Sequence, residues 1–324
     1  MTETLTKAKR MRNLLRDERT VISPGVYDGY SILIVEAMGF KTAGVSGSAL
    51  SNSLIGQPDI GIMSLRENVD ACRHLARSVS IPLMADADTG YGNAVSVYHV
   101  VQYFEEAGIV GINIEDQVWP KRCGHMNGKE LISAREMAAK IEAAVKARKD
   151  PDFIINARTD AIAVEGIDET IERLKIYAAA GADMIYPDAV RDEDDIKRVV
   201  EALPDVPLNI GMGFGIRSRP TTPLLSPKRM KELGIARASM PRMMSAAALA
   251  GMKAALSLLK HSIETGELVD RPDLLVSMEE ITALVGYERI NKLEQEFTTE
   301  EELLRKYGNK RRDYVIHDHA EVAP

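Results

Sequence analysis

The chain has 324 residues, of which 45% are hydrophobic and 5% aromatic, and its formal net charge is −7. This length suits one large domain with a terminal appendage, and the acidic balance excludes the basic footprint of a nucleic-acid-binding protein. The charged first 20 residues lack the apolar core of a signal peptide, and no apolar run approaches the roughly 20 residues that cross a membrane. Two cysteines are too few for a disulfide framework. We therefore expect a cytoplasmic protein that binds neither membrane nor nucleic acid.

Short apolar runs alternate with longer amphipathic segments from residue 21 to about residue 260. The alternation predicts parallel strands joined by crossover helices, and eight such units in about 240 residues fit a (β/α)8 barrel. An open doubly wound sheet could use the same alternation, but no glycine-rich dinucleotide motif or phosphate loop is present. The predicted strands are residues 21–26, 42–47, 81–88, 109–116, 153–160, 183–190, 206–212 and 235–240.

The intervening helices carry local start and stop signals. Several begin at Ser, Asp or Asn, whose side chains accept hydrogen bonds from free helix N–H groups, and two end in glycine. The clearest helical segments are residues 64–79, 93–108, 133–148 and 168–183.

The domain prediction places the catalytic barrel at residues 1–265 and a helical extension with a charged tail at 266–324. The Ala- and Met-rich segment 241–266 is interpreted as the last barrel helix. Its apolar residues lie on more than one face, which also suits packing against another subunit. Residues 277–297 are predicted to form one more helix, and residues from about 298 a loose tail.

Polar side chains stand at the end of nearly every predicted strand, although the residues just upstream are apolar. In a barrel of this kind the carboxyl ends of the strands form one rim, where catalysis takes place. The polar groups at these ends are Ser46, Gly47, Ser48, Asp86, Asp88, Glu115, Asp116, Arg158, Asp160, Asp188 and Asn209.

Three of these acids, Asp86, Asp88 and Glu115, are expected to converge. Oxygen ligands without histidine point to Mg²⁺, with Mn²⁺ as the alternative. The competing interpretation is a set of helix-capping or ion-paired acids. Arg158 suits a two-pronged grip on a carboxylate or phosphate, or a structural ion pair with Asp188.

Cys123 lies in a polar segment, residues 117–131, that follows the fourth strand. Lys121 and Arg122 precede it and His125 follows it, a setting that favours the thiolate. Glycines 124 and 128 allow the segment to bend as a closing lid. The other cysteine, Cys72, lies in a predicted helix and is expected to be a buried structural residue.

The most specific motifs are DADTGYG (86–92), NIEDQ (113–117) and KRCGH (121–125), supported by NARTDA (156–161) and AGADMIYPDA (180–189). With these motifs the chain resembles the isocitrate lyase and phosphoenolpyruvate mutase superfamily over most of its length. The KRCGH segment resembles the lid of the lyase branch, which includes the 2-methylisocitrate lyases and 2-alkylmalate lyases such as 2,3-dimethylmalate lyase.

The resemblance implies a barrel whose final helix is swapped between subunits of a homotetramer, built as a dimer of dimers. It implies Mg²⁺ near Asp86 and Asp88, with Glu115 contributing largely through water. The implied catalytic residues are Cys123, His125, Lys121, Arg158 and Asp188, and the implied substrate-binding residues are Ser46, Gly47, Ser48, Asp59, Gly124, Arg158 and Asn209.

The implied activity is Mg²⁺-dependent cleavage of a carbon–carbon bond in a 2-hydroxy dicarboxylate, giving pyruvate or a related 2-keto acid plus a carboxylate. Cys123 would protonate the leaving fragment. An arginine that holds the extra carboxylate in methylisocitrate lyases aligns with Ala246, although nearby Arg242 could replace it, and Gly44 replaces an aromatic residue. The loss of the arginine at Ala246 favours a two-carboxylate alkylmalate, because an unpaired buried carboxylate is costly. Four competing functions stay open: a 2-methylisocitrate lyase giving pyruvate and succinate, an oxaloacetate hydrolase or decarboxylase, a phosphonomutase, and a barrel without enzymatic activity.

Overall fold

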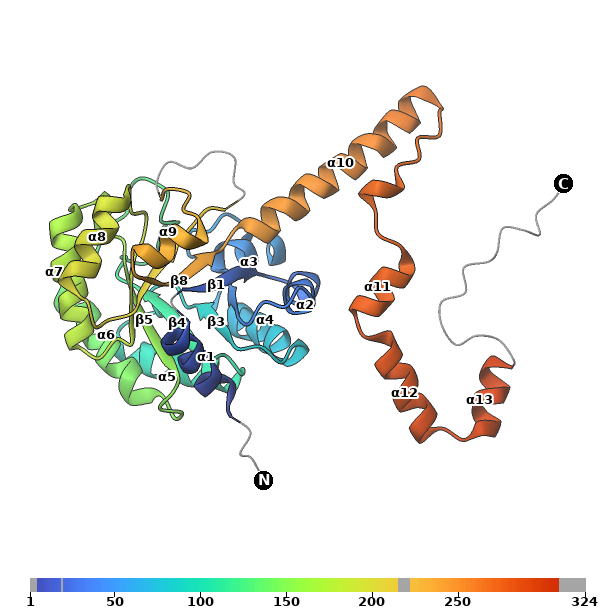
Figure 1. The fold of residues 1–324 in the computed structure, drawn as a ribbon, viewed down its shortest axis with the longest axis horizontal. Helices are drawn as coiled ribbons and strands as arrows, with labels where there is room; N and C mark the ends of the chain where they lie inside the picture. The colour runs from blue at the N-terminus through green and yellow to red at the C-terminus, as the bar shows by residue number, and fades with distance from the viewer. Residues whose placement is uncertain (1–4, 19, 215–221, 309–324) are drawn as a thin grey trace. The chain divides into compact units, whose positions relative to one another are not determined.

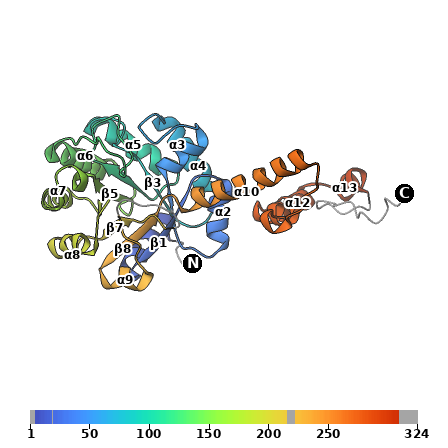
Figure 2. The ribbon, with the colours of Figure 1, turned by 90° about the horizontal axis from the view of Figure 1, so that it is seen from above.

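The computed structural model describes residues 5–18, 20–214 and 222–308. Eight parallel strands close into a barrel in which each strand pairs with the next one and β8 pairs with β1 (Figures 1 and 2). The predicted (β/α)8 class is confirmed, and every strand lies within its predicted run. The strands are β1 (Val21–Val26), β2 (Ala43–Val45), β3 (Leu83–Asp86), β4 (Gly111–Glu115), β5 (Ile154–Thr159), β6 (Met184–Pro187), β7 (Leu208–Gly211) and β8 (Ile235–Met240).

Helices surround this barrel (Figure 2). The predicted caps at Ser64, Asn93 and Ser133 are present, and each side chain accepts a hydrogen bond from a backbone N–H in the first turn. These helices are α1 (Lys7–Asp17), α2 (Gly29–Ala37), α3 (Gly47–Leu54), α4 (Leu65–Ser78), α5 (Ala94–Glu106), α6 (Ala134–Ala147), η1 (Ala161–Ala163), α7 (Ile167–Ala179), α8 (Glu193–Ala202) and α9 (Pro227–Glu232).

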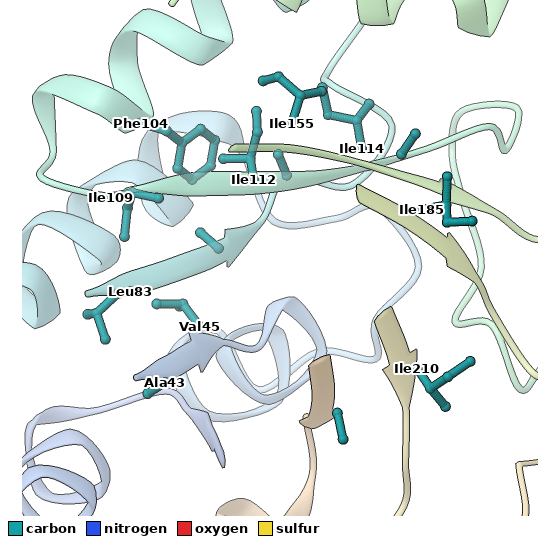
Figure 3. Close-up of a cluster of buried hydrophobic side chains, with 14 of the residues drawn as sticks. Ala43, Val45, Leu83, Phe104, Ile109, Ile112, Ile114, Ile155, Ile185 and Ile210 are labelled. Atoms are coloured by element: carbon teal, nitrogen blue, oxygen red, sulfur yellow. The ribbon is translucent and has the colours of Figure 1, made fainter. Parts of the chain in front are cut away.

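The main hydrophobic core lies between the strands and the helices (Figure 3). Alternate residues of a strand face opposite sides, so Ile112 and Ile114 of β4 join this core. Each such side chain contributes about 1.5–3 kcal/mol by leaving water. A second apolar cluster joins Met11 of α1 to Val21 and Met84 on the strands. Since α1 packs over the amino ends of the strands, the carboxyl ends are left for chemistry.

The chain divides into two compact units, residues 1–249 and 250–324. Helix α10 (Met243–Thr265) crosses this boundary, and none of its residues is buried. The expectation that it covers the barrel as its last helix therefore finds no support within the chain. By length and composition alone α10 could cross a membrane, so the expectation that no apolar run approaches that length is wrong. One such helix is weak evidence for a span.

The segment predicted as one helix over residues 277–297 forms two, α11 (Met278–Leu284) and α12 (Tyr287–Phe297). Gly286, between them, has φ 75°, a left-handed conformation that ends a helix. The predicted loose tail also begins too early, because α13 (Glu300–Tyr307) opens with a capping box at Thr299. A short 3-10 turn, η2 (Pro272–Leu274), precedes α11. Residues 309–324 of the predicted tail lie outside the described residues.

Candidate active site

A cavity of about 80 Å³ opens at the carboxyl ends of the strands, as the barrel fold predicts. Most of the predicted site residues line it, and the others, Gly47, Asp88, Glu115, Lys121 and Asn209, lie outside its lining. The predicted residues that line the cavity are Ser46, Ser48, Asp59, Asp86, Cys123, Gly124, His125, Arg158 and Asp188.

Arg158 is the centre of an ion-pair cluster. Its guanidinium contacts Asp188 at 2.9 Å, Asp160 at 3.0 Å and Glu115 at 3.2 Å. Burial alone would lower the pKa of Arg158, but these carboxylates raise it. Burial raises the pKa of Asp188, but Arg158, together with His125, Lys129 and Tyr186, outweighs it, so the net shift is downward. The ion pair with Asp188 expected as an alternative is therefore present, and it fixes both side chains at the cavity wall.

Asp86 lacks such a partner. It ends β3, lines the cavity, and forms no ion pair with the described residues. Burial, followed by the charge of Asp88, raises the pKa of Asp86 to about 6. A Cβ built on Gly47 would lie 2.7 Å from Asp86 Oδ2, so the absence of a side chain at Gly47 makes room for this carboxylate.

The other two predicted metal ligands are already paired with cations. Lys121 Nζ lies 2.9 Å from Asp88 Oδ1, and Arg158 contacts Glu115. Within the described ranges no group of three His, Cys, Asp or Glu side chains is arranged to hold a metal ion directly. A set of carboxylate oxygens without histidine still fits a Mg²⁺ ion that keeps several of its waters.

Lys121 does not face the thiol as expected from sequence. Only 2% of its side chain is exposed, and its ammonium lies between Asp59 Oδ1 at 2.5 Å and Asp88. Burial opposes its charge, but these carboxylates raise the pKa of Lys121 well above the ordinary value. Lys121 therefore neutralises acids behind the cavity and is not the cation beside Cys123.

Cys123 is buried, with 9% of its surface exposed. Its Sγ accepts a hydrogen bond from Arg242 Nη2 at 2.6 Å. Burial raises the pKa of the thiol, and the charge of Arg242 only partly offsets this effect. The expectation of a thiolate is therefore wrong in direction, because Cys123 is buried in the folded chain and shielded from water. His125 is exposed at its surface, but partial desolvation of the ring lowers its pKa and favours the neutral form.

The Cys123 segment is tied down on both sides. The Gln117 side chain accepts a hydrogen bond from Arg122 N and donates one to Arg122 O, at 2.9 and 2.8 Å. Lys129 Nζ donates to Gly124 O at 2.5 Å and lies 3.3 Å from Asp160 Oδ1. Sequence reasoning missed Gln117 and Lys129, since their partners depend on the path of the loop.

Sequence reasoning also missed the polar interior of the barrel. Arg237 on β8 lines the cavity beside Ser23 and Gly44. The sequence signal that could have revealed this residue is a charge within a short apolar strand, two positions before Ser239. Tyr186 contributes to the same wall, with its ring 5.4 Å from the Arg158 guanidinium carbon.

Comparison with known proteins agrees with this arrangement. A family model described as phosphoenolpyruvate phosphomutase matches residues 11–260. The chain belongs to this family. Among curated members, it is 38% identical to 2,3-dimethylmalate lyase of Eubacterium barkeri, with 90% of this chain and 98% of that protein covered. It is 37% identical to 2-methylisocitrate lyase of Aeropyrum pernix, with 93% and 94% covered.

Solved structures of the superfamily have the same fold. An oxaloacetate acetylhydrolase bound to 3,3-difluorooxalacetate superposes with a TM-score of 0.82 and 29% identity over 90% of this chain and 97% of that one. A 2,3-dimethylmalate lyase, described as a member of the PEP mutase/isocitrate lyase superfamily, gives 0.81 and 28% over 90% and 96%. A phosphonopyruvate hydrolase with oxalate and Mg²⁺ gives 0.79 and 31% over 90% and 99%. The predictions of superfamily and of enzymatic character are confirmed.

Proposed function

We propose that this family member is a Mg²⁺-dependent carbon–carbon lyase that cleaves a 2-hydroxy dicarboxylate, such as a 2-alkylmalate, to a 2-keto acid and a carboxylate. The observation that carries the proposal is a buried Cys123 thiol, whose pKa burial raises, lining the same cavity as Asp86 and Arg158. Relatives named as lyases support the reaction class.

Asp86 at the cavity wall and the two acids behind it suit one hard cation. Asp86 would hold Mg²⁺ directly, and Asp88 and Glu115 would act through its waters. When bound, the ion polarises the substrate's hydroxyl and carboxylate oxygens. The raised pKa of Asp86 supports this role, since a nearby cation would favour its ionised form.

Other groups would bind and orient the substrate. Ser46 caps α3, and the hydroxyl oxygens of Ser46 and Ser48 lie 3.2 Å apart at the cavity wall. These hydroxyls can donate to a substrate carboxylate. Arg158 and Asp188 form a fixed wall beneath Gly124, and His125 lines the cavity from the lid. Asp59 holds Lys121 in place.

The reaction moves one proton from oxygen to carbon. The C2 hydroxyl releases its proton to solvent, the C2–O bond becomes the keto group, and the C2–C3 bonding electrons pass to C3. Cys123 then gives its proton to C3, and Arg242 stabilises the thiolate that remains. The thiolate regains a proton from solvent when the products leave, so no net proton is gained or lost. The closed lid keeps water from the carbanion until the proton arrives.

The substrate proposal follows from the cavity. Arg242 lines the cavity, but its guanidinium donates to Cys123. It therefore does not replace the arginine, missing at Ala246, that would bind a third carboxylate. A substrate with two carboxylates therefore fits better than one with three. A high kcat/KM on 2-methylisocitrate, with none on alkylmalates, would overturn this choice.

We also propose a cytoplasmic homotetramer in which α10 is exchanged between subunits. Five large apolar side chains on α10 are exposed at intervals of three and four residues, the spacing of a helix–helix seam. They are Leu249, Met252, Leu256, Leu259 and Ile263.

The decisive test is a coupled keto-acid assay with Mg²⁺ on 2,3-dimethylmalate, other 2-alkylmalates, 2-methylisocitrate, isocitrate and oxaloacetate. We expect keto-acid release from an alkylmalate, and a fall of about 10²- to 10⁴-fold in Cys123→Ser, the range that a general acid supplies. Turnover of oxaloacetate alone, unaffected by this substitution, would instead identify the second candidate, an oxaloacetate hydrolase or decarboxylase. The likeness to oxaloacetate acetylhydrolase is the observation that favours this second candidate.

A further inference from the structure

Arg237 is a guanidinium held in the interior of the barrel. It lies on β8, three residues before the strand ends, and only 1% of its surface is exposed. It lines the catalytic cavity together with Ser23 and Gly44. Inward positions of such barrels are usually filled by branched apolar residues, so a buried charge here needs a separate explanation.

The partners of Arg237 within the described residues are neutral. Its Nη1 donates to Asn209 Oδ1 at 3.0 Å and its Nη2 donates to Ser23 Oγ at 2.8 Å, while the buried Nε has no hydrogen-bond partner. Burial lowers the pKa of Arg237 to about 10, so the side chain is still positively charged at neutral pH. An unpaired buried charge is costly, and a bound anion would remove that cost.

The surroundings leave room for a ligand and supply further donors. A Cβ on Gly44 would lie 2.9 Å from Arg237 Nη2, so the bare backbone at Gly44 keeps space beside the guanidinium. Among the described residues the buried amide Nδ2 of Asn209 has no hydrogen-bond partner, and its orientation is set because Arg237 donates to Oδ1. A cation with nearby N–H donors and no acid matches a carboxylate.

We propose that Arg237 binds one carboxylate of the substrate, deeper in the barrel than the strand-terminal Asp86. The inference rests on the proposed function, because it places the two ends of the dicarboxylate. One carboxylate lies near Ser46 and the metal-binding acids, and the other reaches Arg237. The residue therefore selects a dicarboxylate over a monocarboxylate of the same length.

The test measures binding by calorimetry with Mg²⁺, using malate and 2-hydroxybutyrate, which differ by a carboxylate in place of a methyl group. We expect the wild-type protein to bind malate more tightly by on the order of 100-fold, and Arg237→Met to lose that preference. Affinity for 2-hydroxybutyrate should change little. Arg237→Lys should recover part of the preference, because it restores the charge without the planar fork.

Two further variants distinguish binding from structure. Gly44→Val retains Arg237 but places a side chain against it, and should also abolish the malate preference. Arg148→Met removes an arginine that pairs with Asp183 away from the cavity, and should leave the preference intact. Without ligand, Arg237→Met should melt at or above the wild-type temperature, since it removes an unpaired buried charge; a purely structural arginine would give a lower melting temperature.

An unchanged malate preference in Arg237→Met overturns the proposal. An equal loss of affinity for malate and 2-hydroxybutyrate in this variant, or a wild-type protein that does not bind malate, overturns it too. A chloride titration tests an inorganic occupant. Chloride binding that requires Arg237 while malate binding does not would also overturn it. Because binding is measured and not turnover, a failed lyase assay leaves this test valid, and failure here leaves the lyase proposal standing.

Discussion

Arg242 donates a hydrogen bond to the Sγ of Cys123 across 2.6 Å, although the two residues are 119 positions apart in the chain. The contact brings the end of β8 against the lid. It places a fixed positive charge beside a thiol that burial keeps protonated. A thiol that donates its proton becomes a negatively charged thiolate, and the adjacent guanidinium stabilises that charge.

The first prediction concerns the protonation of Cys123. Because burial raises its pKa above the ordinary 9.0, the thiol should remain protonated at neutral pH, and iodoacetamide alkylation should inflect above pH 9. Arg242→Met should move the inflection to still higher pH, since the guanidinium lowers the pKa. Cys123→Ser is the control for reaction at the fully buried Cys72. An inflection below pH 8 would contradict the protonated donor.

The second prediction concerns the close approach of Gly124 to the cavity wall. A Cβ at this position would overlap Asp188 Oδ2 and Arg158 Nη2. Gly124→Ala should therefore prevent closure and reduce kcat/KM by about 100-fold, the effect of displacing a catalytic group by about 1 Å. Gly128→Asn is the matched control, because Asn tolerates the left-handed backbone at φ 78°. Equal activity of the two variants would sink the idea.

The third prediction concerns Lys129, which joins Gly124 O to Asp160 and so positions the lid. Lys129→Met should accelerate hydrogen exchange of amides 122–128 by about 10-fold, the loss expected for a charged hydrogen bond. Exchange in the barrel strands should not change, because the contact is local. Lys146→Met, on the exposed side of α6, serves as the control. A uniform acceleration throughout the barrel would show a structural role instead.

The fourth prediction concerns metal binding at Asp86. Asp86→Asn removes the carboxylate proposed to contact Mg²⁺ directly and should weaken Mg²⁺ binding, measured by calorimetry, by at least about 10-fold. Asp70→Asn, on the outer face of α4, should have no effect. Equal Mg²⁺ affinity in both variants would rule out Asp86 as the ligand.

The fifth prediction concerns the exposed apolar seam of α10. Leu256→Glu places a charge in the middle of this seam and should dissociate the proposed assembly, measured by sedimentation. Ser257→Glu, one position round the helix, adds the same charge off the seam and should leave the mass unchanged. A wild-type protein that sediments as a monomer would remove the basis for the exchange of α10.

The barrel and its catalytic rim were predictable because they depend on local patterns. The short apolar runs that form the strands, and the caps at Ser64 and Ser133, depend only on neighbouring residues. Parallel strands then bring their carboxyl ends to one rim, so Asp86 and Arg158 could be placed at one cavity without knowing any contact.

Only the tertiary structure decided the charge states. The sequence places Lys121 two residues from Cys123, and this proximity suggested that Lys121 acts on the thiol. In the folded chain Lys121 forms ion pairs with Asp59 and Asp88, and the cation that contacts the thiol is Arg242, which follows β8. The pKa of a thiol depends on burial as well as on charge, and burial arises only when residues 117–131 pack against the barrel. The same holds for Arg237, which has no acidic partner within the part of the chain that the structure describes. Its surroundings are set by the packed interior and not by its neighbours in the chain.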